Sequence, residues 1–342
     1  MTSTDEVTIS RTGRVGRITL TRPQALNALN LPMVERIGAT LAAWAGEDLR
    51  AITIESASDR AFCSGGDIRQ VRQNTLDGDP EASDRFFATE YEVNRMLGEY
   101  PIPIVSLIGG ICMGGGLGIS VHGPFRVVTE NAAFAMPETK IGFFPDGGGS
   151  NFLPRLPGHI GSYLGLTGAR IDAADALAIG MAKHGCAPEA LAGVPELLAE
   201  RDGPIDTVLK ELAPDAAPPH AHWRSDLMAH REQIDHCFGA SSIDGIRERL
   251  RRDGSPWATE TLELLAGVSP YSLAVTAELM AWGRERSLAD CLAMERAVAR
   301  HVATTPDFIE GVRAALVDKD RAPVWSEFTG LDPALRPAFR RL

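Results

Sequence analysis

The sequence predicts an α/β protein whose first half contains a largely parallel sheet and whose second half is helical. Short β-rich runs alternate with helical patterns in the first half of the 342 residues, as they do in βαβ folds. From about residue 160 the β-rich runs disappear and helical patterns take over. The Pro- and Ala-rich stretch 213–221 is the best linker candidate, so we expect an α/β core over 1–212 and a helical region over 213–342.

Four apolar runs are the predicted strands of the core. They cover residues 16–20, 51–55, 103–108 and 125–129. Between the first two, Asn30 is expected to cap a helix, because Asn is a favoured N-cap residue and apolar residues recur after it at helical spacing. A helix between two such strands is the pattern that predicts parallel pairing.

Five helical segments are predicted after the linker. They lie near 224–237, 242–252, 256–266, 270–283 and 288–302. The last shows a clear pattern, because its apolar residues form one stripe along the predicted helix.

The bulk composition excludes several classes of protein. A net charge of −11 argues against nucleic acid as the main partner, because binding phosphates requires a basic face. No apolar run reaches the length of about 18 residues that a membrane span needs. The N-terminus shows no signal or transit pattern, and the five scattered cysteines suit reduced thiols, so we expect a cytoplasmic protein. No tight metal-ligand spacing is present, so no metal is expected.

Two glycine-rich segments suggest a site for developing negative charge. Residues 61–68 and 109–118 each follow a predicted strand and place backbone N–H groups at the start of a predicted helix. Two such groups aimed at one carbonyl oxygen would form an oxyanion hole. The alternative is that the glycines only allow tight turns. A phosphate-binding P-loop does not fit, because no Gly-Lys-Ser/Thr follows.

The motifs AFCSGGDI, GGICMGGGLGISVHG and FAMPETKIGFFPDGGGSNFLPRLPG resemble the crotonase (enoyl-CoA hydratase/isomerase) superfamily in order and spacing. TRPQALNAL and TGARIDAADALAIGMA also match that family, so the resemblance covers roughly residues 8–190. It implies a spiral of ββα turns with helices appended at the C-terminus. It also implies an acyl-CoA substrate, with CoA as part of the substrate and no separate cofactor, and it leaves a homo-oligomer open.

The resemblance assigns binding roles to both glycine-rich segments. It implies that the backbone N–H groups of Ser64 and Gly115 form the oxyanion hole, with Gly114 and Gly115 at the acyl group. The residues that it implies for the CoA tunnel are Gln24, Ala25, Leu26, Gly66, Asp67 and Ile68.

The carboxylates separate the reactions of the superfamily. Hydratases carry two glutamates; the second matches Glu138, but the first falls on Gly118, so hydration is not expected. Asp146 follows Glu138 by eight residues. The alternative is that Asp146 caps a helix beginning near Gly148, but the family context favours catalysis. Such a Glu/Asp pair occurs in 3-hydroxyisobutyryl-CoA hydrolases and in dienoyl-CoA isomerases.

The residues around the pair resemble the hydrolase branch. FFATEYEVN adds Glu90 as a substrate-site carboxylate, and most of 224–325 resembles the same branch. The implied reaction is hydrolysis of 3-hydroxyisobutyryl-CoA, or a similar short 3-hydroxyacyl-CoA, as in valine degradation. Glu138 would either attack the carbonyl or activate a water, with Asp146 orienting the water or the substrate hydroxyl. Enoyl-CoA hydration, dienoyl-CoA isomerisation and non-catalytic CoA binding are the alternatives.

Overall fold

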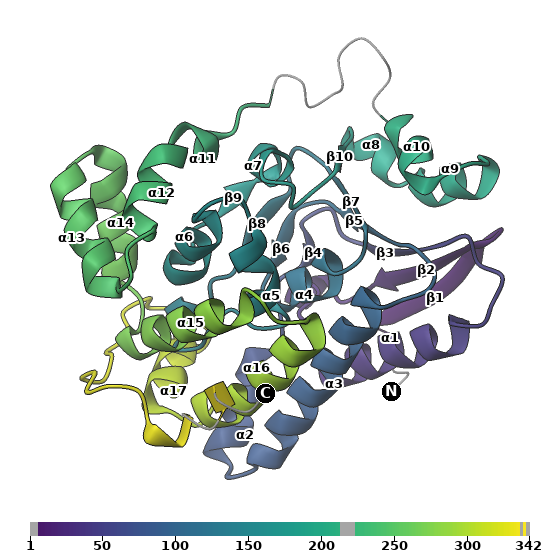
Figure 1. Ribbon diagram of the computed structural model, residues 1–342. Coiled ribbons are helices and arrows are strands. Elements are labelled where there is room, and N and C mark those ends of the chain that lie inside the picture. Colours follow the sequence, from purple (N-terminus) through teal and green to yellow (C-terminus); the bar gives the residue numbers. More distant parts are fainter. Residues whose placement is uncertain (1–5, 213–222, 336–337, 340–342) are drawn as a thin grey trace. The chain divides into compact units, whose positions relative to one another are not determined.

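The computed structural model describes residues 6–212, 223–335 and 338–339 (Figure 1). The chain divides into two compact units, and each unit is made of three separate chain segments. The first unit comprises Met1–Gly66, Glu92–Phe134 and Ile171–Met228. The second unit comprises Asp67–Tyr91, Ala135–Arg170 and Ala229–Leu342.

The predicted linker 213–221, which includes His220, lies outside the described residues, and so does the following His222. The predicted division between a core over 1–212 and a helical region over 213–342 stays a prediction.

The main sheet of the first unit has six strands in the order β1-β2-β3-β5-β7-β10. Strands β1 and β2 are antiparallel and the other neighbours are parallel. Their bounds are Val7–Thr12 (β1), Val15–Leu20 (β2), Ala51–Ser56 (β3), Ile104–Ile108 (β5), Phe125–Val128 (β7) and His184–Gly185 (β10). All four predicted strands are confirmed, as β2, β3, β5 and β7. Their apolar side chains are buried, as expected for strands of a parallel sheet.

A second sheet of four short strands carries the glycine-rich segments. Its order is β4-β6-β8-β9, with bounds Ala61–Cys63 (β4), Ile111–Met113 (β6), Ala133–Ala135 (β8) and Ile171–Asp172 (β9). Strands β4 and β6 are parallel and β8 and β9 are antiparallel. These strands were not predicted, because runs of two or three residues show no periodicity. Strands β9 and β10 also correct the expectation that β structure ends near residue 160.

Helices of the first unit support the main sheet. Helix α1 (Leu31–Trp44) begins as predicted, because the Asn30 side chain accepts a hydrogen bond of 3.0 Å from the Met33 amide. The other helices whose bounds lie within the unit are α4 (Gly115–Val121), α7 (Ala173–Ala178), α8 (Pro188–Leu191), α9 (Val194–Glu200) and α10 (Ile205–Lys210). Apolar residues of α9 and α10 pack on Val15, Ala51 and Val105 of the sheet.

The C-terminal half is helical, as predicted. The prediction for 224–237 corresponds to two helices, α11 (Asp226–Ala229) and α12 (Arg231–Phe238), which are separated at His230. The predictions that follow are confirmed as α13 (Ile243–Asp253), α14 (Pro256–Ala266), α15 (Pro270–Gly283) and α16 (Leu288–Val302). A serine side chain caps each of these four helices at its N-terminus.

The remaining helices are α2 (Ile68–Leu76), α3 (Pro80–Gly98), α5 (Gly149–Phe152), α6 (Ile160–Thr167) and α17 (Pro306–Val312). Short 3₁₀ turns cover Pro23–Ala25 (η1), Glu138–Ile141 (η2), Leu153–Arg155 (η3) and Pro333–Leu335 (η5), and a π turn covers Arg313–Val317 (η4).

Within the described ranges, no single helix has both the length and the apolar character that crossing a membrane requires. The pair α14 and α15, bent by 106°, meets the requirement together, by length and composition only.

Candidate active site

The two glycine-rich loops meet in the first unit. They follow β4 and β6, which are parallel neighbours, so both loops leave the same end of the sheet. A Cβ atom on Gly65 would lie 3.7 Å from the Gly115 nitrogen. A Cβ atom on Gly116 would lie only 2.4 Å from the Cys63 carbonyl oxygen, so this close approach requires glycine.

One of the two predicted oxyanion donors is free in this arrangement. Gly115 is the first residue of α4, where the amides have no partner within the helix, and its N–H donates no hydrogen bond among the described residues. The N–H of Ser64 instead donates to the Leu26 carbonyl oxygen at 3.0 Å. The assignment of Ser64 as a donor is therefore corrected, because an amide bound inside the protein does not stabilise an external oxyanion.

Gly66 supplies the alternative amide. Its neighbour Gly65 accepts a hydrogen bond of 2.8 Å from the Leu29 amide. Leu29 and Gly66 thereby form an isolated parallel β-bridge, which holds the loop in place. The N–H of Gly66 itself donates to no acceptor in the described part of the chain. The sequence predicted Gly66 only as a CoA-binding residue. Neighbouring glycines of one loop differ in which backbone amides are already paired, and the sequence does not show this pairing.

The loop implied for CoA binding is held by a residue that the sequence analysis missed. Leu26 and Asn27 both have a positive φ, of 50° and 54°. The fully buried Asn27 side chain accepts from the Arg22 amide at 2.8 Å and donates to the Phe62 carbonyl at 3.0 Å. Gln24 and Ala25 lie in η1, just before these residues, so Asn27 connects their loop to β4.

The other implied CoA residues, Asp67 and Ile68, stand at the start of the second unit. Asp67 is the N-cap residue of α2, and Ile68 is the first residue of that helix.

The predicted carboxylates come together in the second unit. Glu90 lies on α3, Glu138 begins η2, and Asp146 lies in the loop before α5. Their exposed fractions are only 3%, 7% and 8%. The hydroxyl of Tyr91 donates to Oδ2 of Asp146 at 2.6 Å, which ties α3 to the loop.

Burial and mutual repulsion favour the protonated forms of this cluster. Burial raises the pKa of Glu138 well above 4.5, and the charge of Asp146 raises it further. The same two causes raise the pKa of Glu90. Burial also raises the pKa of Asp146, to about 6, although the Tyr91 hydrogen bond lowers it. Each of these groups is therefore suited to exchange a proton closer to neutral pH than an ordinary carboxyl.

Glu138 has an oxygen available for chemistry. Its Oε2 atom is buried and has no hydrogen-bond partner among the described residues. A buried, unpaired carboxylate oxygen is unfavourable for stability, and such groups occur where function requires them.

Glu295 holds the loop that carries Asp146. Its carboxylate accepts from the Gly148 amide at 2.8 Å, the Ser150 amide at 2.9 Å and the Ser150 hydroxyl at 2.5 Å. Burial raises the pKa of Glu295 to about 8 against these donors, which favour its anion. The alternative role of Asp146 as a helix cap is wrong, since α5 begins at Gly149 without a side-chain cap.

Aromatic rings provide the apolar surroundings in the second unit. Phe143 stacks on Phe144 with ring centroids 4.4 Å apart and on Phe87 at 5.5 Å. Phe143 lies between Glu138 and Asp146 in sequence, and Phe87 lies one turn before Glu90 and Tyr91 on α3. The ring of Phe87 also lies 5.8 Å from that of Tyr91, the partner of Asp146, so apolar rings contribute to the burial of the acid cluster.

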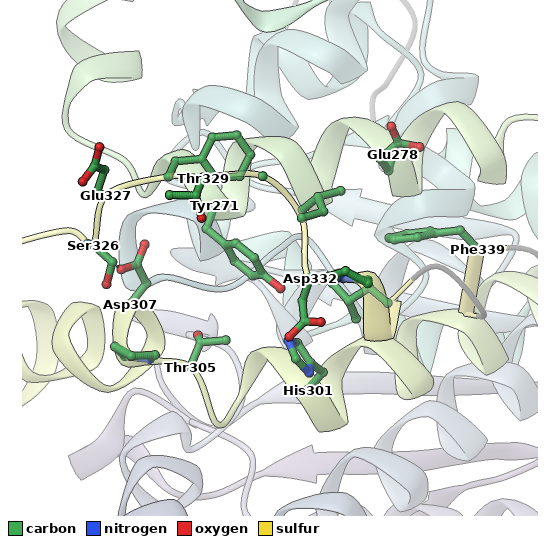
Figure 2. Close-up of a pocket in the computed structure, with 16 residues that line it drawn as sticks. Tyr271, Glu278, His301, Thr305, Asp307, Ser326, Glu327, Thr329, Asp332 and Phe339 are labelled. Carbon is green, nitrogen blue, oxygen red and sulfur yellow. Dashed lines mark hydrogen bonds and ion pairs between the residues drawn. The ribbon is translucent and has the colours of Figure 1, made fainter.

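A cavity of about 1000 Å³ in the second unit contains none of the predicted site residues (Figure 2). It is lined by Tyr271, His301, Asp307 and Asp332, among others. The Nε2 atom of His301 lies 3.4 Å from Oδ2 of Asp332, and the buried Asp307 accepts from the Ser269 hydroxyl at 2.5 Å. Within the described ranges, no group of three or more His, Cys, Asp or Glu residues is arranged to hold a metal ion.

A family model described as enoyl-CoA hydratase/isomerase matches residues 15–332. The chain therefore belongs to the enoyl-CoA hydratase/isomerase family, that is, to the crotonase superfamily. The mixed α/β fold, with parallel strands and C-terminal helices, matches structures of that superfamily.

Two curated relatives carry the same name, "3-hydroxyisobutyryl-CoA hydrolase, mitochondrial". The protein from Danio rerio is 41% identical over 329 residues, which are 95% of this chain and 86% of that protein. The protein from Homo sapiens is 40% identical over 332 residues, which are 94% of this chain and 84% of that protein.

Two solved structures share the whole fold but carry different names. A carnitinyl-CoA dehydratase from Mycobacterium thermoresistibile has a TM-score of 0.89 and 34% identity, covering 99% of this chain and 97% of that one. An enoyl-CoA hydratase from Rhodobacter sphaeroides 2.4.1 has a TM-score of 0.85 and 35% identity, covering 98% and 96%.

Proposed function

We propose that this chain is an acyl-CoA thioester hydrolase that converts 3-hydroxyisobutyryl-CoA, or a similar short 3-hydroxyacyl-CoA, to the free acid and CoA. The observation that carries the proposal is the buried, unpaired Oε2 atom of Glu138 within a cluster of neighbouring carboxyls. The names and the coverage of the curated relatives support the same substrate.

The proposed chemistry combines charge stabilisation by backbone amides with proton transfer or attack by a carboxylate. The N–H groups of Gly66 and Gly115 would stabilise the negative charge that develops on the thioester oxygen. In one route, Glu138 attacks the carbonyl carbon, the C–S bond breaks, the CoA thiolate takes up a proton, and water hydrolyses the resulting anhydride. In the other, Glu138 removes a proton from a water that adds to the same carbon before the thiolate leaves. Asp146, with its pKa near 6, would carry the proton in either route.

Both routes use only water, the thioester and side chains of this chain, so the proposal includes no separate cofactor. A role in valine degradation follows if the hydroxyisobutyryl group is the preferred acyl group. The cytoplasmic localisation predicted from the sequence stays a prediction, and the curated relatives are named mitochondrial.

The names of the solved structures make hydration the second candidate. Gly118 argues against it, because hydratases of the superfamily carry a glutamate at that position and glycine supplies no acid or base. Hydration of an enoyl-CoA removes a double bond without releasing CoA, whereas hydrolysis releases a thiol.

The test is thiol release from 3-hydroxyisobutyryl-CoA by the wild type and by Glu138→Gln, followed with a thiol reagent. We expect wild-type turnover, and a loss of about 10²–10⁴-fold in the variant because general-base or nucleophilic catalysis is removed. Calorimetric binding of CoA should persist, since the amide keeps the shape of the side chain.

Glu130→Gln is the matched control, because Glu130 is exposed and should tolerate the same change. Near-normal thiol release by Glu138→Gln would refute the role of Glu138. A wild type that releases no CoA but consumes an enoyl-CoA would instead establish hydration.

A further inference from the structure

Asn94 is a buried amide without a partner. Its side chain is 0% exposed, and both Oδ1 and Nδ2 lack a hydrogen-bond partner among the described residues. Burying an unpaired amide is unfavourable, and most buried polar atoms are therefore paired. Asn94 lies on α3, one helical turn after Glu90.

The amide faces the start of α4. A Cβ atom built on Gly118 would lie 3.0 Å from Nδ2 and 3.3 Å from Oδ1 of Asn94, so the two residues are in direct contact. Gly118 lies in the first turn of α4, which begins with the free amide of Gly115. The unpaired side chain of Asn94 therefore lies beside the helix end that carries an oxyanion donor.

We infer that Asn94 recognises the 3-hydroxyl group of the substrate. The inference rests on the proposed function and identifies the side chain that selects a 3-hydroxyacyl group over an unsubstituted one. A carboxamide offers an acceptor and a donor side by side, and a hydroxyl group satisfies both at once. Glycine at position 118 leaves room for the amide at this point, whereas any side chain there would press against it.

The selectivity arises from the unpaired amide. With the hydroxylated substrate, both polar atoms of Asn94 are paired. With the deoxy substrate they stay buried and unpaired, and sites built around a hydroxyl discriminate strongly for this reason. A residue that only positioned the attacking water would affect both substrates equally.

The experiment compares 3-hydroxyisobutyryl-CoA with isobutyryl-CoA, which differ only in the hydroxyl group. The ratio of kcat/KM for the two thioesters is measured in the wild type, Asn94→Ala and Asn94→Leu. We expect the ratio to fall by tenfold or more, about the effect of one lost hydrogen bond, with kcat/KM for isobutyryl-CoA retained within about threefold. Asn94→Leu should also raise the thermal unfolding midpoint, because it removes a buried unpaired amide.

Binding provides a readout that does not depend on hydrolysis. In the Glu138→Gln background, the affinity for the hydroxylated thioester over the deoxy thioester should fall by a similar factor when Asn94 is replaced. Glu130→Gln, an exposed change in the same unit, should leave both ratios unchanged. Equal losses for both thioesters, or unchanged ratios, would overturn the inference. Absence of thiol release by the wild type would refute the proposed function alone, because the binding ratios still test Asn94.

Discussion

At the scale of single residues, Tyr91 is the direct partner of Asp146. Its hydroxyl donates to Asp146 at 2.6 Å and lowers the pKa of that carboxyl. Tyr91 stands directly after Glu90 in the FFATEYEVN motif, but the sequence alone does not show that its hydroxyl reaches a residue 55 positions later.

Tyr91→Phe removes this hydrogen bond and should raise the pKa of Asp146. The acidic limb of the kcat/KM profile should therefore move to higher pH, because the carboxylate forms only at higher pH. The maximal rate should fall by about tenfold to a hundredfold, the effect of a hydrogen bond to a charged group. Rates measured between pH 5 and about 9 check both expectations.

Tyr100→Phe is the control for this change, because the Tyr100 hydroxyl donates to the Leu41 carbonyl and not to a carboxyl. Its pH profile should equal that of the wild type. A Tyr91→Phe profile with an unmoved acidic limb would contradict the role of Tyr91.

At the scale of elements, a contact between α16 and α5 sets the position of the Asp146 loop. Glu295 lies on α16 and accepts from two amides and one hydroxyl of Gly148 and Ser150. In sequence, Glu295 falls on the apolar stripe of its helix, three residues after Leu292 and seven after Leu288. A charged residue on an apolar stripe indicates a carboxylate that is buried and paired inside the protein.

Glu295→Gln should destabilise the protein by about 1–3 kcal/mol, because a glutamine amide group leaves at least one of the loop donors unpaired. Urea unfolding at pH 8 measures the change in the free energy of unfolding. Turnover should also fall, with little change in KM, because Glu295 positions Asp146 and does not bind substrate.

Glu285→Gln is an exposed control on the segment before α16 and should change neither quantity. If Glu295→Gln kept wild-type turnover, the loop would be held by other contacts and the positioning role would be wrong.

At the scale of the whole molecule, buried acids make stability depend on pH. The pKa values of Glu90, Glu138, Asp146 and Glu295 are all raised. The folded state therefore binds more protons than the unfolded state above pH 4.5, and the free energy of unfolding falls as pH rises toward 8. Other carboxyls have lowered pKa values, among them Asp84, Asp235, Asp253 and Glu310.

Those carboxyls, and the buried His184, act in the opposite direction on the acid side. Stability from the lowered carboxyls is lost as pH falls below their ordinary values, and stability from the lowered His184 is lost below 6.5. Because the four raised acids outweigh the one histidine, we expect the thermal unfolding midpoint to be highest at about pH 5 and to fall toward pH 8. Glu138→Gln should flatten the alkaline fall. A midpoint that rises steadily from pH 6 to 8 would show that the buried acids do not control stability.

Much of the fold follows from local pattern. The apolar runs that became β2, β3, β5 and β7 and the spacing that became α13 to α16 depend on neighbours in sequence, which the chain displays directly. The short strands β4 and β6 do not follow from local pattern, because their pairing involves residues about fifty positions apart.

The sequence by itself determined the family, the helical C-terminal half and the choice of Glu90, Glu138 and Asp146. Each of these depends only on which residue types occur at which spacing along the chain. Only the tertiary structure decided which amides are free, so that Gly66 replaces Ser64 as the proposed donor. It also decided that Tyr91 contacts Asp146 and that Glu295 holds the Asp146 loop. The physical reason is that hydrogen-bond pairing and burial depend on contacts between distant segments, which no local pattern of residues records.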